Sequence, residues 1–483
     1  MEPLTWTGPF GGFMDPIFTV VLVIFLILIA LQVIGAYTLP AVNDRVLADG
    51  TIIRDRGPNA LIGTGVHYAL LALVAVCVIY IVAGMFTPLG TVGIVGALAA
   101  QLSPVWITLL ATFAISIVYK RKLGLYGKLF DSPVGMIGYG IVMFWVYTAI
   151  FAGVFDMITT HDSLAQVSGM KNKGPGTPLR GASEGEFPYY LLGGDNLARD
   201  VFSRVVEGSW IVITIAPPAT LFAFMVGITL GLPAGYFGGR LDTFLSFLAN
   251  LVLASPVILL FYLLVTPEIV LLGVPNYLAV VLFIFPIIFV TVLLNSRFYT
   301  RPKLRTPLLL SVVGLLFWFY LCLVSAKGSV IDVLPSTLDL FDISSGFLVV
   351  FVSVAFVNSI TVFRIVRGLA LDIQTRDYVA AAQTRGEGPW YIMLWEILPN
   401  ARGPLIVDFC LRIGYTTILL GTLGFFGLGL PPESPDWGTT INDGRKLMQL
   451  YVHPVLPPAF ALLTLVLGLN LLADGLREES LRD

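Results

Sequence analysis

The feature that most constrains this chain is a series of apolar runs, each long enough to cross a lipid bilayer as a helix. A bilayer core needs about 20 apolar residues per helix, and only helices or closed barrels satisfy the backbone inside lipid. The runs are continuous rather than alternating with period two, which favours helices over barrel strands. Only 12% of the 483 residues are charged, too few to cover the surface of a water-soluble chain of this length. The sequence therefore predicts an all-α, polytopic membrane protein.

The apolar runs predict about 11 transmembrane helices. The predicted spans are residues 16–39, 66–86, 92–119, 134–157, 210–236, 243–266, 277–295, 307–325, 347–366, 404–428 and 455–475. No Lys or Arg precedes the first run, whereas a secretory signal peptide needs a basic start. We therefore expect the first run to be a retained span.

Basic residues gather in three connectors between these spans, residues 120–128, 297–305 and 364–402. Lys and Arg in short loops mark the cytoplasmic side of a membrane protein. All three connectors fall on one side, so we expect that side and the C-terminus to be cytoplasmic. The acidic connector 326–346, the long segment 158–209 and the N-terminus are then expected outside.

The composition supports few other function classes. The net charge of −2 gives no reason to expect nucleic-acid binding. Cys77, Cys322 and Cys410 each lie in an apolar run, so we expect small buried side chains, and no Cys/His cluster has metal-ligand spacing. The sequence lacks the phosphate-binding pattern G-x-x-x-x-G-K-[ST], so active transport would need another chain to hydrolyse ATP.

The most informative segment is residues 377–407, which read DYVAAAQTRGEGPWYIMLWEILPNARGPLIV. Its alanines favour a helix, Gly386 ends that helix, and Gly388 with Pro389 begins a second one rich in aromatic and aliphatic residues. The pattern predicts a helix-turn-helix on the membrane surface. Its aromatic residues either enter a groove on a partner protein or pack on the chain's own spans.

The order of these residues resembles the EAA loop of binding-protein-dependent ABC importer permeases, in the branch that carries peptides and nickel. The resemblance implies a type I permease core whose loop, residues 377–400, docks on an ATPase subunit and transmits its closure. The residues that it assigns to coupling are Asp377, Ala381, Ala382, Gly386, Trp390, Ile392, Trp395, Glu396 and Pro399. Asp377 replaces the usual Glu, and Trp395-Glu396 replaces Arg-His.

Four further segments resemble the same branch, namely residues 193–204, 234–242, 427–444 and 470–477. Ala198 stands where the family has Gly. Any one Gly-rich segment could instead be a tight interhelical turn. The family's usual subunit has about six spans, so residues 1–130 are expected to be an N-terminal extension with three extra spans, and residues 131–483 the permease core. Residues 270–340 would then be an inserted helix pair, and bracing in the membrane is the simplest role for both additions.

Asp408 and Arg412 lie one helical turn apart inside a predicted span. Charged residues in spans are costly and often functional. The two side chains either line the translocation path or neutralise each other as an internal i,i+4 ion pair.

The resemblance implies a transport subunit rather than an enzyme, located in the cytoplasmic membrane. The implied partners are two ATPase subunits that hold ATP and Mg, a second permease subunit and an extracytoplasmic solute-binding protein. Di- or oligopeptides are the expected cargo, with nickel or another small solute as the alternative.

Two rival hypotheses remain. A stand-alone secondary transporter would show inverted repeats and paired intramembrane acids, and we find no convincing repeat. A membrane-embedded enzyme would need a catalytic constellation, yet Ser203 and Ser255 have no nearby His in the sequence and no HExxH occurs.

Overall fold

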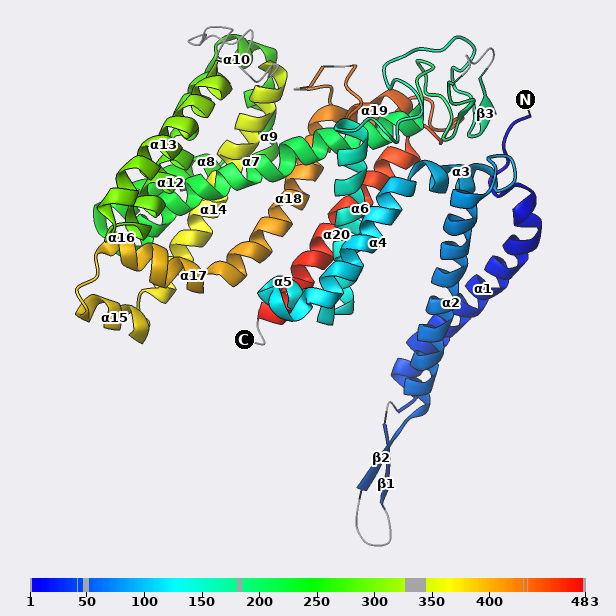
Figure 1. Cartoon of the computed structure of the whole chain (residues 1–483), viewed down its shortest axis with the longest axis horizontal. Coiled ribbons are helices and arrows are strands. Elements are labelled where there is room, and N and C mark those ends of the chain that lie inside the picture. Colours follow the sequence, from blue (N-terminus) through cyan, green and yellow to red (C-terminus); the bar gives the residue numbers. More distant parts are fainter. Residues whose placement is uncertain are drawn as a thin grey trace. The chain divides into compact units, whose positions relative to one another are not determined.

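The computed structural model describes residues 2–40, 42–46, 52–179, 185–325, 345–428, 430–431 and 433–480. Residues 326–344 of the predicted acidic connector, and Gly429 and Pro432 of the 427–444 segment, lie outside this range. The chain divides into two compact units (Figure 1). Unit 1 comprises Met1–Trp106 and Ile158–Phe202, and unit 2 comprises Ile107–Met157 and Ser203–Asp483.

Unit 1 is built on a helical hairpin. Its elements are α1 (Gly8–Thr38), β1 (Val42–Val46), β2 (Ile52–Arg56), α2 (Pro58–Phe86), α3 (Gly93–Gln101), the start of α4 (Ser103–Tyr119), β3 (Thr177–Pro178) and β4 (Tyr189–Tyr190). The antiparallel pair β1–β2 connects α1 to α2. The two helices pack around Met14, Val76 and Tyr80, and the Tyr80 hydroxyl donates a hydrogen bond to Asp15.

The described residues between 158 and 200 of unit 1 have little regular structure and are held by buried polar contacts. Arg199 donates from its side chain to Asp195 at 2.7 Å. Asp200 accepts hydrogen bonds from Thr160 at 2.6 Å and from the backbone N–H of Phe202. Ala198 has φ of +64°, a left-handed conformation that costs a non-glycine residue about 1–2 kcal/mol. Glycine, which the family has at this position, adopts this conformation without that cost.

Unit 2 is a helical bundle (Figure 1). Besides the rest of α4, it contains η1 (Lys120–Lys122), α5 (Gly124–Lys128), η2 (Leu129–Asp131), α6 (Pro133–Gly153), α7 (Val201–Phe237, from Ser203), α8 (Gly239–Leu253), α9 (Val257–Val265), α10 (Pro267–Leu271), α11 (Val274–Leu282), α12 (Ile284–Arg297), α13 (Pro302–Val324), α14 (Ser345–Ile373), α15 (Asp377–Thr384), α16 (Pro389–Tyr391), η3 (Ile392–Ile397), α17 (Leu398–Asn400), α18 (Arg402–Phe425), α19 (Trp437–Arg445) and α20 (Leu456–Ser480).

Small residues let the helices of unit 2 approach closely. Gly227, Gly231 and Gly235 repeat every four residues along α7 and face α14. A methyl group at any of them would come within 3 Å of Val362, Phe363, Val366 or Ala370. This small-residue stripe is a usual packing device of membrane helices, where close van der Waals contact replaces the hydrophobic effect.

The described residues contain ten helices that are long and apolar enough to cross a membrane, or eleven if one bent pair is counted. This confirms the predicted fold class and the approximate number of spans. The predicted span 243–266 is not one continuous helix, because α8 and α9 form the bent pair and meet at 81° where Pro256 interrupts the helix. The predicted span 92–119 is likewise divided into α3 and α4 at Leu102.

The cysteines differ from the prediction at one position. Cys322 and Cys410 are buried as expected, but Cys77 is exposed on α2. An apolar run that faces lipid exposes its side chains as readily as it buries them, so a position in such a run does not determine burial.

We predict that residues 158–200 become less stable as the pH rises. Burial by itself would lower the pKa of His161. The hydrogen bond to Asp200 and the negative charge of Asp200 outweigh this effect, with smaller contributions from the Phe187 carbonyl and the charge of Glu186, so the pKa of His161 is raised above its usual value of 6.5. A raised pKa stabilises the folded segment fully below about pH 6.5, and this contribution is lost as the pH passes the raised value. Limited proteolysis should therefore cut the segment faster at pH 9 than at pH 6, relative to an unstructured peptide. The variant His161→Gln should lose this difference, and an unchanged ratio in the variant would contradict the assignment.

Candidate functional site

The segment 377–400 forms the helix-turn-helix that the sequence predicts. Helix α15 ends at Thr384 with Arg385 as its C-cap, and Gly386 adopts φ of +80°. The backbone N–H of Gly386 donates to Gln383 O at 2.9 Å, and that of Glu387 donates to Ala382 O at 3.2 Å. These two bonds form a Schellman motif, in which the residue after the cap takes a left-handed conformation that favours Gly. Gly386 is thus fixed by the turn itself.

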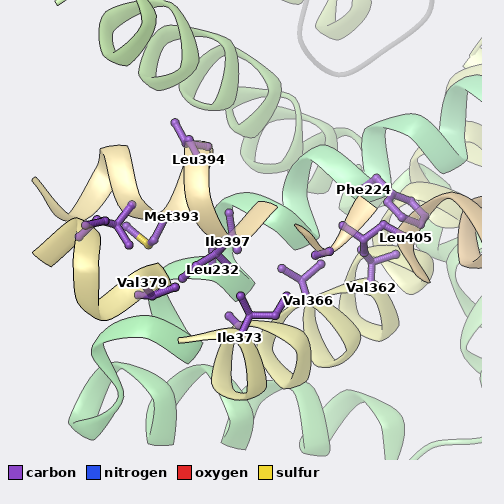
Figure 2. Packing of buried hydrophobic residues seen from close by; sticks show 14 residues of the cluster. Phe224, Leu232, Val362, Val366, Ile373, Val379, Met393, Leu394, Ile397 and Leu405 are labelled. Atoms are coloured by element: carbon purple, nitrogen blue, oxygen red, sulfur yellow. The ribbon is translucent and has the colours of Figure 1, made fainter. Parts of the chain in front are cut away.

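The second half of the segment is held from inside the bundle. Pro389 opens α16, and Ile392–Ile397 follow as a π-helical turn, a rare feature that is often found at functional sites. Ile392, Met393, Leu394 and Ile397 of this turn are buried. Figure 2 shows Met393, Leu394 and Ile397 in one cluster with side chains of α7, α14, α15 and α18. The labelled members from those helices are Phe224, Leu232, Val362, Val366, Ile373, Val379 and Leu405.

The structure divides the predicted coupling residues into an exposed and a buried group. Those exposed are Asp377, Ala381, Gly386, Trp390 and Pro399. Ala382 and Ile392 are buried in the cluster. Trp395 and Glu396 are half-buried. The surface that the segment offers therefore comes from α15, the Gly386 turn and α16, where Trp390 is 45% and Tyr391 38% exposed.

Trp395 does not face outward but packs on α12. Its indole N–H donates to Ser296 Oγ at 2.6 Å, and the Arg297 guanidinium lies over its ring at 5.0 Å from the centroid. Phe289, Val292 and Leu293 of α12 also pack against the cluster. Ser296 and Arg297 were not predicted as partners of the segment 377–400. The only sequence signal for this contact was that Ser296 and Arg297 follow the predicted span 277–295, on the same side of the membrane as the segment 377–400.

Two polar features complete this face. Glu396 accepts a hydrogen bond from Arg385 at 3.0 Å, which ties the second half of the segment to the end of the first. A cavity of about 580 Å³ lies between α12 and the residues from Gly386 to Tyr391. Val292, Asn295, Ser296 and Tyr299 form its other wall.

The turn at residues 234–242 is joined to the helix that leads into the segment. Arg367 of α14 donates from Nη2 to Asp242 Oδ2 at 2.6 Å, and from Nε to the other oxygen. Paired donation from a guanidinium to a carboxylate fixes both direction and distance. The family-like segment 234–242 is thus held to the helix that precedes the segment 377–400.

Asp408 and Arg412 form the ion pair that their spacing permits, with Arg412 Nε 2.6 Å from Asp408 Oδ2. Arg412 also donates to Thr361 of α14. The side chain of Asp408 is 19% exposed and that of Arg412 is 11% exposed. Their ion pair therefore compensates for hydration that each charge has lost.

The N-terminal end of α7 forms hydrogen bonds with α19 and with the segment that precedes it. Arg204 donates to Ser434 O at 2.8 Å and to Thr440 Oγ1 at 3.1 Å. The Trp437 indole N–H donates to Val205 O at 2.9 Å. Asp436 caps α19 by accepting from the backbone N–H of Thr439. Asp474, in the fourth of the family-like segments, is exposed on α20.

Residues 304–478 match the model of the family described as binding-protein-dependent transport system inner membrane component. The resemblance to binding-protein-dependent permeases is thereby confirmed for this region of the chain. The family match and the ten or eleven apolar helices among the described residues together indicate a multi-pass inner-membrane protein. The matched region includes the whole of α14 to α19 and hence the segment 377–400.

Individual relatives extend the similarity beyond this region. The dipeptide transport system permease protein of Haemophilus influenzae is 28% identical over 61% of this chain and 75% of its own length. The glutathione transport system permease protein of Pectobacterium atrosepticum is 27% identical over 61% and 73%. The dipeptide transport system permease protein of Alkalihalophilus pseudofirmus is 26% identical over 73% and 87%.

The Trp395–Ser296 hydrogen bond predicts a measurable coupling between α12 and the segment 377–400. Trp395→Phe and Ser296→Ala should each lower the free energy of unfolding by about 1 kcal/mol, and the double variant should lose little more. The measurement is a double-mutant cycle by denaturant titration in mixed micelles.

A matched control uses Thr464, which accepts from the indole of Trp145 instead. Trp395→Phe combined with Thr464→Ala should be additive, since these two residues share no partner. Additivity in the Trp395/Ser296 pair as well would contradict the contact.

Proposed function

We propose that this chain is the permease subunit of an ATP-driven importer for di- or oligopeptides, coupled to its ATPase through residues 377–400. One observation carries the proposal: the segment is anchored by its buried half in helices α7, α14 and α18, while its turn and α16 are exposed. A coupling element needs both properties, because it must bind a partner and transmit displacement to the spans.

The proposed orientation places this segment in the cytoplasm. Within unit 2, α15 to α17 lie at the same end as the last turns of α20, and α10 and α19 lie at the opposite end (Figure 1). The basic connector 297–305 contacts the segment through Arg297 and Trp395. An excess of Lys and Arg on one side supports a cytoplasmic location for that side. The N-terminus is proposed to lie outside.

The proposed partners are two ATPase subunits that bind ATP and Mg, a second permease subunit and an extracytoplasmic solute-binding protein. Closure of the ATPase pair would displace the exposed turn and α16, and the buried half would carry the motion into α14 and α7. Such coupling requires two states with different contacts and no chemical step in this chain. Asp408 and Arg412 remain a proposed part of the translocation path.

Peptides are the favoured cargo because the named relatives are dipeptide and glutathione permeases. Glutathione is itself a small peptide. Nickel or another small solute would need selection by the binding protein, since the described residues hold no cluster of metal-ligating side chains.

The exposed aromatic pair tests the proposed coupling surface. Full-length tagged chain should co-purify with subunits that carry the G-x-x-x-x-G-K-[ST] loop, and Trp390→Ala with Tyr391→Ala should reduce their recovery several-fold, because these side chains would enter the partner's groove. Tyr451→Ala removes a tyrosine of matched exposure, 37%, outside the segment and should leave recovery unchanged. Equal recovery with all variants, or peptide uptake by the purified chain alone, would overturn the proposal.

The Gly386 turn tests transmission separately from docking. Gly386→Val forces a β-branched residue into a left-handed conformation at a cost of about 1–2 kcal/mol, so ATP-coupled peptide uptake should fall about tenfold. Gly388→Ala is the control, because Gly388 has φ of −71° and an added methyl group there meets no atom within 4 Å. Undiminished uptake with Gly386→Val would count against the role of this turn.

A further inference from the structure

We propose that the groove between α12 and α13 binds an anionic phospholipid, with the headgroup phosphate at Arg305 and an acyl chain along α13. This site goes beyond the coupling function and does not depend on it. The two helices form a hairpin joined by residues 298–301, and a groove of about 560 Å³ opens between them.

The groove is polar at the end near the connector and apolar along the rest. Asn295 and Arg305 lie at the polar end, and Leu309, Val313 and Phe317 line the apolar part. The hydroxyls of Thr291 and Thr306, which also line it, donate to carbonyls of their own helices. The main polar groups that remain for a ligand are thus the Asn295 amide and the Arg305 guanidinium.

Arg305 differs from the other basic residues of the connector. Arg297, Arg301 and Lys303 are exposed, whereas Arg305 is half-buried at the mouth of the groove, with its guanidinium 5.8 Å from the centre of the Tyr299 ring. Among the described residues, no carboxylate forms an ion pair with Arg305. The sequence contains no Asp or Glu from residue 269 to residue 331. The charge complementary to this site must therefore come from outside the hairpin.

The dimensions of the groove match one leaflet. Arg305 and Phe317 are 12 residues apart on one helix, a rise of about 18 Å. Half the hydrocarbon core of a bilayer is about 15 Å. Gly314 leaves the groove open, because an added methyl group there meets no atom within 4 Å. Basic pockets between membrane helices on the cytoplasmic side are a known way of binding anionic headgroups, and the apolar depth beside this one suits an acyl chain rather than a soluble phosphate.

Native mass spectrometry of the full-length detergent-purified chain tests the site, with phosphatidylglycerol and phosphatidylcholine as probes. The chain should retain phosphatidylglycerol in preference to phosphatidylcholine. Arg305→Gln should lower the retained phosphatidylglycerol about fivefold, the factor for one basic residue near an anionic surface. Gly314→Leu should lower it by filling the groove, and Gly314→Ala should do so less.

Lys303→Gln is the charge-matched control, since it removes an exposed cation from the same connector. It should leave retention unchanged, and thermal unfolding should confirm that all variants are folded. Equal loss with Lys303→Gln would show diffuse surface charge rather than a site, and unchanged retention with Arg305→Gln or equal retention of the two lipids would also overturn the proposal. The assay contains no ATPase, so its failure is separate from failure of the coupling proposal.

Discussion

The burial of the π-helical turn 392–397 is the constraint on which the rest of unit 2 depends. Each of its aliphatic side chains contributes about 1.5–3 kcal/mol by leaving water. Their partners lie on α14 and α18, which flank the segment in the sequence, and on α7, which is distant from it. Detaching this turn would expose all these surfaces at once. The segment 377–400 and the ends of these helices therefore form one mechanical element.

The parts of this arrangement that could be predicted from the sequence are those set by local chemistry. Hydropathy predicted the spans because lipid demands long apolar helices, and Gly386 predicted its turn because a Schellman motif favours Gly. Which face of each short helix in the segment 377–400 is buried could not be predicted, because it depends on tertiary contacts with other helices. The contact of Trp395 with Ser296 joins residues 99 positions apart, and no local pattern encodes it. Apolar composition also failed to reveal the break between α8 and α9, which are both hydrophobic enough to continue as one helix.

The contact with α12 changes how the region 270–340 is interpreted. The sequence suggested a helix pair that braces the subunit within the membrane. In the structure, α12 contributes a hydrogen bond, a cation–π contact and three apolar side chains to the same element that buries residues 392–397. This region therefore shapes the candidate coupling site itself. Any chain with this architecture that lost α12 would leave the Trp395 indole without its acceptor and expose one side of the cluster.

The stripe of glycines on α7 has a mechanical consequence. Gly227, Gly231 and Gly235 lie in close contact with α14. The C-terminal part of α7, which contains these glycines, therefore cannot slide along α14 without steric clash. The helix has 37 residues and is about 55 Å long. Near its N-terminal end, Arg204 donates hydrogen bonds to Ser434 and Thr440. Pro217 and Pro218 lie between these two attachments and weaken the backbone hydrogen bonding there. Helix α7 is thus held at both ends and is most easily bent at Pro217 and Pro218 between them. A small tilt of one end would therefore displace the residues attached to the other end.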